Sequence, residues 1–120
     1  RYENFRFALG DVVADNASSS AFVVGAWLPA DTDVADVPMV MSVDGVVAET
    51  GSSAAILGDP IRSLVAAARL AGAAGLTLQP GWTVMLGGAT AAAAMGSARA
   101  VSLDAGPLGQ VGFTIAGGAT

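Results

Sequence analysis

Apolar residues along this chain occur in short runs, and their spacing predicts a β-rich α+β fold with about six strands and one long helix. Alternation or clustering of apolar residues assigns strands to 2–9, 21–25, 38–43, 46–49, 98–103 and 110–115. The clearest element is a hairpin, because Asp44-Gly45 is a preferred turn between two of these runs. No internal repeat or flexible linker interrupts the pattern, which therefore predicts a single domain over residues 1–120.

The long helix is predicted near 59–72. Asp59 is a candidate N-cap, and Pro60 suits the first helical position because its missing N–H needs no partner there. An apolar stripe at helical spacing follows, made of Ile61, Leu64, Val65 and Ala68. Gly72 or Gly75 is expected to end the helix.

A glycine-opened loop follows the further apolar run 82–86, which is itself predicted to be a buried strand. Gly87 and Gly88 can adopt positive φ and allow other groups to approach the backbone closely. Exposed N–H groups in such a loop, together with the Thr90 hydroxyl, can bind an anion. The loop is therefore a candidate carboxylate site, and a tight connection without a ligand is the equally weighted alternative.

A polar cluster at 15–19 separates a short helix, predicted to begin near Asp11, from the apolar run 21–25. In a functional interpretation, Ser18 contacts a substrate and Asn16 holds the local backbone. The alternative is a set of caps that closes the short helix. The residues alone favour that alternative.

Composition limits the partners and the location of the protein. Apolar residues make up 53% of the chain and charged residues 12%, which predicts an obligate partner such as a second copy. No apolar run approaches the length of a membrane span, and no signal-peptide pattern is evident. We therefore expect a cytoplasmic protein that does not enter a membrane.

The residue types that are missing limit the chemistry. The chain has no His, Lys or Cys, which excludes Cys–His and Ser–His nucleophilic pairs, Schiff-base lysines and His metal ligands. A net charge of −5 argues against nucleic-acid binding. Carboxylates, hydroxyls, backbone amides and hard metals remain. We assign no catalytic residue and no metal site to this chain.

Five segments in a fixed order carry a family resemblance: RYENFRFALGDVVADNASSS, the Asp-Gly hairpin, ETGSSAAILGDPIRSLVAAARLA, PGWTVMLGGATAAAAM and GPLGQVGFTIAG. Together they resemble the C-terminal part of the 4-oxalocrotonate decarboxylase and 2-oxopent-4-enoate hydratase family, within the fumarylacetoacetate-hydrolase-like superfamily. The Gly-Gly-x-Thr form of 87–90 favours the decarboxylase branch.

The resemblance implies a mixed sheet or roll and a metal-dependent lyase of aromatic meta-cleavage degradation. Its reaction would convert 2-oxohex-3-enedioate (4-oxalocrotonate) to 2-hydroxypenta-2,4-dienoate, with Mg²⁺ or Mn²⁺ in the full-length family. Ser18 matches a serine that faces the substrate, Gly88 and Thr90 match the loop that closes over the pocket, and Asn16 is a supporting residue. The implied partners are a 2-oxo dicarboxylic acid and either further copies of the chain or the pathway hydratase.

One departure from the family pattern changes the expectation for activity. The family's metal-binding Glu residues and its catalytic Lys and Asp precede the segment that matches Tyr2, and no residue here matches them. We therefore expect the chain to be the C-terminal portion of a longer catalytic domain and inactive alone. A hydratase and a non-catalytic oligomeric scaffold module are the alternatives.

Overall fold

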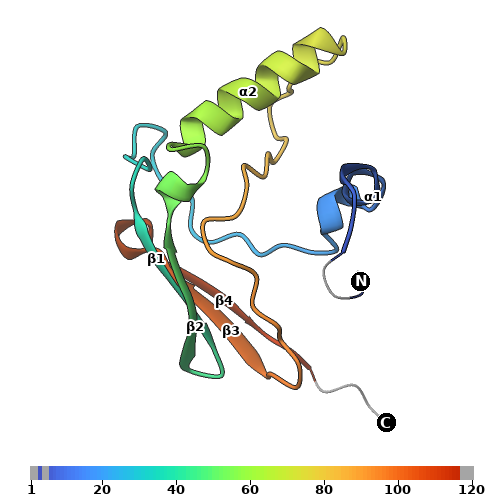
Figure 1. The fold of residues 1–120 in the computed structure, drawn as a ribbon. Helices are drawn as coiled ribbons and strands as arrows, with labels where there is room; N and C mark the ends of the chain where they lie inside the picture. The colour runs from blue at the N-terminus through green and yellow to red at the C-terminus, as the bar shows by residue number, and fades with distance from the viewer. Residues whose placement is uncertain (1–2, 4–5, 117–120) are drawn as a thin grey trace.

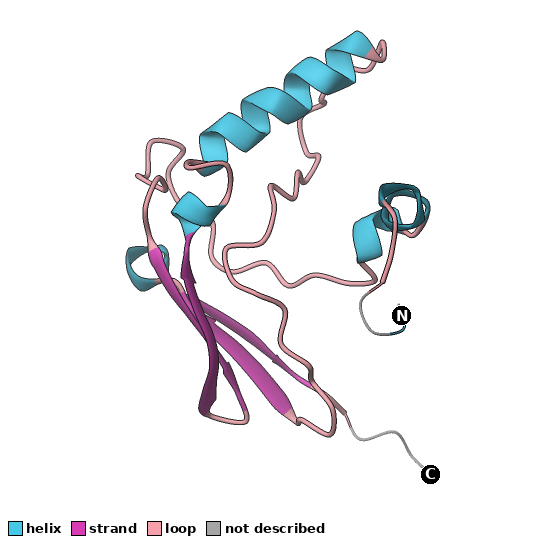
Figure 2. Ribbon diagram, viewed as in Figure 1, coloured by secondary structure: helices cyan, strands magenta, loops and turns pink. Residues whose placement is uncertain are grey.

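The computed structural model describes residue 3 and residues 6–116, and its elements form a four-stranded sheet with separate helices (Figures 1 and 2). The strands are β1 (Pro38–Val43), β2 (Val46–Ser52), β3 (Ala100–Asp104) and β4 (Gln110–Thr114). The α-helices are α1 (Leu9–Ala14) and α2 (Pro60–Ala73). Short 3₁₀ turns are η2 (Asn16–Ser18), η3 (Ser53–Ala55) and η4 (Gly106–Leu108). The α+β class is as predicted.

The sheet has the order β2-β1-β3-β4, and every pairing among the described strands is antiparallel. The mixed sheet that the resemblance implied is therefore wrong for this part of the chain. The predicted hairpin is confirmed, because Asp44 and Gly45 both have positive φ (49° and 80°), as a type I′ turn requires. The second strand runs to Ser52, three residues beyond the predicted end at residue 49.

Helix α2 has the predicted start. The Asp59 carboxylate accepts a hydrogen bond of 2.8 Å from the N–H of Ile61, and Pro60 is in the first turn. Ala74 is the C-cap, and Gly75 follows it with φ at 75°. The apolar stripe has little cover, since Val65 is 62% exposed. Among the described helices, none is long and apolar enough to cross a membrane.

Three predicted strands do not appear in the sheet that the described residues form. Residues 2, 4 and 5 of the predicted strand 2–9 lie outside the described residues, and Leu9 begins α1 instead. Residues 21–25 and 82–86 have no strand partner among the described residues. In Figure 1 both are irregular segments that cross between the sheet and the helices. The apolar pattern was present, but a strand also needs a neighbour that completes its hydrogen bonds.

Very little of the chain is buried. Val37 and Ala105 are the buried hydrophobic residues among those described, while Trp27 and Trp82 are 86% and 58% exposed. The radius of gyration is 16.0 Å, against about 13.6 Å for a compact domain of this length. The accessible surface is 8920 Å², against about 5900 Å² for a folded monomer of this mass. The apolar surface of this chain is thus largely uncovered.

Candidate functional site

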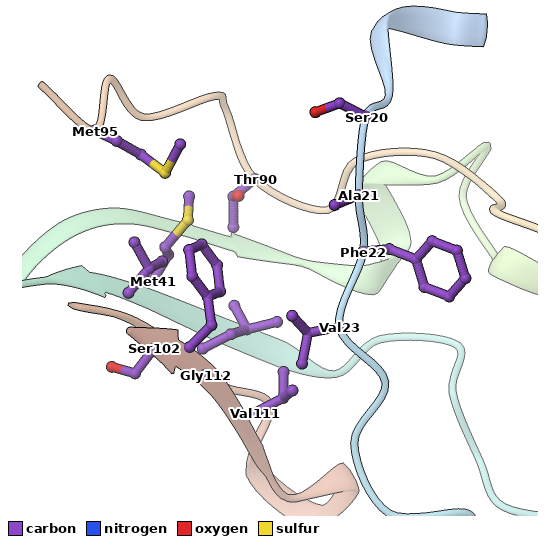
Figure 3. A pocket seen from close by; sticks show the side chains of 13 residues that line it. Ser20, Ala21, Phe22, Val23, Met41, Thr90, Met95, Ser102, Val111 and Gly112 are labelled. Carbon is purple, nitrogen blue, oxygen red and sulfur yellow. The ribbon is translucent and has the colours of Figure 1, made fainter. Parts of the chain in front are cut away.

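An open hollow of about 520 Å³ lies over one face of the sheet (Figure 3). It is lined by Ser20, Ala21, Phe22, Val23, Met41, Thr90, Met95, Val101, Ser102, Leu103, Val111, Gly112 and Phe113. Strands β1, β3 and β4 supply its floor, and the segments 20–23 and 90–95 supply its walls. The hollow therefore joins parts of the chain that are seventy residues apart in the sequence, Ser20 and Thr90.

The floor is apolar because the register places Met41, Leu103 and Val111 opposite one another on neighbouring strands. Cross-strand partners lie on the same face of an antiparallel sheet. In Figure 3, Met41 and Met95 reach into the hollow, and Val23 faces it from the wall, while the ring of Phe22 points away. A carbon chain fits such a floor better than water does.

The polar side chains that line the hollow are hydroxyls rather than charged groups. Ser20 and Ser102 are exposed and Thr90 is half-buried. The Thr90 hydroxyl donates to its neighbour's carbonyl, Ala91 O, at 3.0 Å. Within the part of the chain that the structure describes, the N–H groups of residues 87–91 donate no hydrogen bond. These amides are therefore available to an acceptor such as a carboxylate.

The glycine-opened loop is held at its start by two contacts. The hydroxyl of Ser63 on α2 donates to Leu86 O at 2.7 Å. The side chain of Ile56 lies 3.5 Å from the position that a Cβ would occupy at Gly87. Positive φ was considered possible at both glycines of the loop. Gly87 adopts it, with φ at 132°, and Gly88 does not. Gly88 does not line the hollow; it lies two residues before Thr90, which does.

A second hollow of about 480 Å³ lies on the other side of the same wall. Asn16, Ser19, Ser20, Ala21, Phe22, Thr83 and Met85 line it. The amide of Asn16 donates to Ser19 O at 3.4 Å, and Asn16 and Ala17 both have positive φ (49° and 52°). This local bond fits both interpretations of Asn16, as a support of the backbone and as a cap that closes the turn. Ser18 ends η2, but its side chain lies outside the described part.

The structure therefore separates the predicted site residues into two neighbouring hollows, with Thr90 in one and Asn16 in the other. Ser20 is the residue that sequence reasoning missed, since it lines both. Its signal was its position between the polar cluster and an apolar run.

The acidic residues do not form a metal centre in the described part. No three of its Asp and Glu side chains come close enough to hold a metal ion. Asp104 has a pKa below its usual value of 3.8, because Gly106 N–H and the Gln110 side chain donate to its carboxylate. That carboxylate is exposed and lines neither hollow.

Comparison with known proteins places these observations in a family. No protein-family model matches the chain. A 4-oxalocrotonate decarboxylase from a Pseudomonas species is 53% identical over 98% of the chain and 46% of the relative. The enzyme of the same name from Pseudomonas putida is 39% identical over 92% of the chain and 43% of the relative. A 2-hydroxyhexa-2,4-dienoate hydratase from Comamonas testosteroni is 34% identical over 72% of the chain and 34% of the relative.

The fold comparison agrees with the sequence comparison. A solved 4-oxalocrotonate decarboxylase from Pseudomonas putida G7, complexed with magnesium and adipate, has a TM-score of 0.79 and 35% identity. It is matched over 92% of this chain and 43% of its own. The chain thus spans slightly less than half the length of the relatives it matches. Over nearly its whole length, the chain is homologous to the 4-oxalocrotonate decarboxylase and 2-oxopent-4-enoate hydratase family.

Proposed function

We propose that this chain is the substrate-holding portion of a lyase that decarboxylates 2-oxohex-3-enedioate to 2-hydroxypenta-2,4-dienoate. The observation that carries the proposal is the hollow itself. In a chain 53% identical to a decarboxylase, the Ser20 and Thr90 hydroxyls line a hollow with an apolar floor, and Thr90 belongs to a loop whose N–H groups donate no hydrogen bond within the described part of the chain. A six-carbon dicarboxylate needs both features, because its carboxylates need donors and its carbon chain needs apolar contact. The adipate bound by the solved relative is also a six-carbon dicarboxylate.

In this proposal the loop of Gly88 and Thr90 binds one carboxylate through backbone N–H groups and the Thr90 hydroxyl. Ser20 supplies a second hydroxyl from the opposite wall. Ser18 remains a candidate substrate contact and Asn16 its support, since Asn16 fixes the turn that leads to the wall. Met41 and Leu103 contact the carbon chain and exclude water from it.

We propose further that residues 1–120 are the C-terminal portion of a longer catalytic domain with a fumarylacetoacetate-hydrolase-like roll. The exposed surface supports this, since it exceeds that of a folded monomer by roughly 3000 Å². A standard interface covers only about 800 Å² per partner. The additional exposed area is therefore several times the area of a standard interface. It is of the size expected where a further part of the same domain covers the core. The unpaired segments 21–25 and 82–86 would gain their neighbours from that part.

The magnesium of the solved relative has no counterpart that the described residues could hold. Too few metal-ligating side chains lie together, because no three carboxylates are close to one another anywhere in that part of the chain. The residues of this chain bind and orient the substrate in our proposal, and the bond-breaking chemistry is left to groups outside it. Alone, the chain would be inactive.

The decarboxylase is favoured over the hydratase by the extent of the match. The decarboxylases from Pseudomonas sp. and Pseudomonas putida match 98% and 92% of the chain at 53% and 39% identity, whereas the Comamonas hydratase matches 72% of it at 34% identity. The enzyme would act in the cytoplasm on an aromatic meta-cleavage product. Further copies of the enzyme, or the hydratase that consumes its product, would be its protein partners.

The test is a fused enzyme, in which this chain replaces the matching segment of the Pseudomonas decarboxylase that is 53% identical to it. With Mg²⁺ and 2-oxohex-3-enedioate, it should release CO₂ and form the dienoate. Conversion of 2-hydroxypenta-2,4-dienoate to 4-hydroxy-2-oxopentanoate without CO₂ release would identify a hydratase instead. A folded fused enzyme with neither activity would support a scaffold module, and calorimetry with Mg²⁺ and adipate would check for a residual site.

A further inference from the structure

The backbone of strand β2 touches the glycine-opened loop at one residue, Gly51. A Cβ built on Gly51 would overlap the carbonyl oxygen of Ala89, and it would lie 3.0 Å from the carbonyl carbon of the same residue. It would also lie 3.1 Å from Cγ2 of Thr90. Real Cβ atoms do not approach a backbone carbonyl so closely, and the obstacle is main chain rather than a flexible side chain. Only glycine allows the loop to occupy this position.

Gly51 belongs to the same face of the sheet as the floor of the hollow. It pairs with Met39, and two residues further along the strands Glu49 pairs with Met41, which pairs in turn with Leu103. Alternate residues of a strand point to one face, so Met39, Met41 and their partners share that face. The missing side chain at Gly51 therefore leaves room on the floor side of the sheet, where the loop lies against it.

The contact also orients Thr90. Its Cγ2 methyl group lies against Gly51, and its hydroxyl donates to Ala91 O. In Figure 3 the Thr90 side chain stands beside the hollow between Met95 and the extended wall. Residues 88–92 make no backbone hydrogen bond to another element within the described part of the chain. Gly51 is thus a point of close approach between the Ala89–Thr90 segment and the sheet.

We propose that Gly51 is a positioning residue. Because it has no side chain, the Ala89–Thr90 backbone packs directly against the sheet, and this packing sets the distance between the Thr90 hydroxyl and a bound carboxylate. This inference rests on the proposed function for the identity of the ligand. The packing of the loop against Gly51 does not depend on that function. A Cβ at this position forces the loop away from the floor. The hollow then keeps its apolar surface but loses the aligned donors at its rim.

The test compares Gly51→Ala with Gly72→Ala in the fused enzyme. Gly72 lies in α2 with nothing within 4 Å of a built Cβ, so the same chemical change meets no obstacle there. Thr90→Ser is the milder variant, because it removes the methyl group that lies against Gly51 and leaves the backbone and the hydroxyl in place. Two readouts are taken for each protein: KM and kcat for decarboxylation, and the nuclear Overhauser effect between the Thr90 methyl group and the Gly51 α-hydrogens.

We expect Gly51→Ala to raise KM by about 10- to 100-fold, with a smaller change in kcat, since displacement of a binding group by about 1 Å has effects of this size. Thr90→Ser should raise KM by about 2- to 5-fold, and Gly72→Ala should behave as the parent. The Overhauser effect should be present in the parent protein and in Gly72→Ala. An unchanged KM in a folded Gly51→Ala protein would overturn the proposal, and so would the absence of the Overhauser effect in the parent.

The two proposals fail in different ways. If the parent fused enzyme shows no lyase activity, the proposed function fails. The Overhauser effect and the calorimetric affinity for adipate then still test whether Gly51 positions the Ala89–Thr90 backbone. If the parent is active and Gly51→Ala has the KM of the parent, the positioning role of Gly51 is rejected and the proposed function stands.

Discussion

Asp44 at the tip of the hairpin binds the start of β3 through Ala100, which lies 56 residues later in the chain. Its carboxylate oxygen Oδ1 accepts hydrogen bonds of 2.8 Å from the N–H of Ala100 and the N–H of Arg99. Its own N–H donates to Ala100 O at 2.9 Å. One residue thus forms the type I′ turn and also fixes the register of the central β1–β3 pair.

Replacement of Asp44 by alanine should destabilise the fused enzyme by about 2 kcal/mol. It removes two hydrogen bonds to a charged acceptor and puts a Cβ-bearing residue without a local polar partner at positive φ. Asp44→Asn is the matched control, because it keeps one acceptor oxygen and tolerates this conformation; it should cost less than half as much. Urea denaturation measures both. Equal losses in the two variants would contradict this account.

Ser53 is the most buried polar residue that the structure describes, at 1% exposed. Its hydroxyl donates to Val34 O at 2.6 Å and accepts from the N–H of Val37 at 2.7 Å. Ser53→Ala leaves both backbone groups without that partner in a site closed to water, so we expect a loss of about 2–3 kcal/mol. Ser97→Ala, at an exposed position, should change stability by less than about 0.5 kcal/mol. A similar melting curve for both variants would count against the role of Ser53.

Asp104 should make the stability of the sheet depend on pH in the acid range. Its folded pKa is lowered by hydrogen bonds from Gly106 N–H and the Gln110 side chain, so the charged form is favoured in the folded state. The stabilisation is fully present above the usual pKa of 3.8 and is lost as the pH falls through the lower, folded value. Asp104→Ala should therefore melt earlier than the parent at pH 7 and together with it in strong acid.

The control for this prediction is Asp31→Ala, since Asp31 is an exposed loop residue whose carboxylate accepts no hydrogen bond within the described part of the chain. Thermal midpoints between pH 2.5 and 7 should show a pH-dependent difference for Asp104→Ala and none for Asp31→Ala. A difference for Asp104→Ala that stays constant down to the lowest pH would exclude the carboxylate as its origin.

Ser20→Ala tests the wall opposite the loop. If the hydroxyl of Ser20 binds a substrate carboxylate, its loss should raise KM by about 5-fold, which corresponds to about 1 kcal/mol for one hydrogen bond. The thermal midpoint should stay unchanged because Ser20 is exposed. Ser97→Ala serves again as the control, with both quantities at parent values. A fall in kcat without a change in KM would assign Ser20 a different role.

The sequence predicted the elements whose signals are local. The Asp44-Gly45 turn, the Asp59 cap and Pro60 each act within a few residues, so the hairpin and α2 formed where expected. The runs 21–25 and 82–86 are as apolar as real strands, yet they stay outside the sheet. Strand formation depends on a neighbour far away in sequence, and these segments have none among the described residues.

The site was predictable to the same degree. Thr90 was proposed from its glycine-opened loop, and it lines the larger of the two hollows, while its binding role stays a prediction. Ser20 and Gly51 were missed because their roles depend on which segments meet in space. Nothing in the local sequence around Gly51 indicates that Ala89 will lie against it, since the two are separated by a helix and a long irregular segment.

The two outer strands of the sheet differ in how well they resist unwanted association. β2 carries Glu49, whereas β4 (Gln110–Thr114) has neither a charged residue nor a proline to discourage pairing along its free side. An unprotected edge of this kind is a template for strand addition. In preparations of this chain by itself, β4 is where copies would join edge to edge into a longer sheet, and a single lysine at exposed Thr114 would be the simplest way to keep them apart.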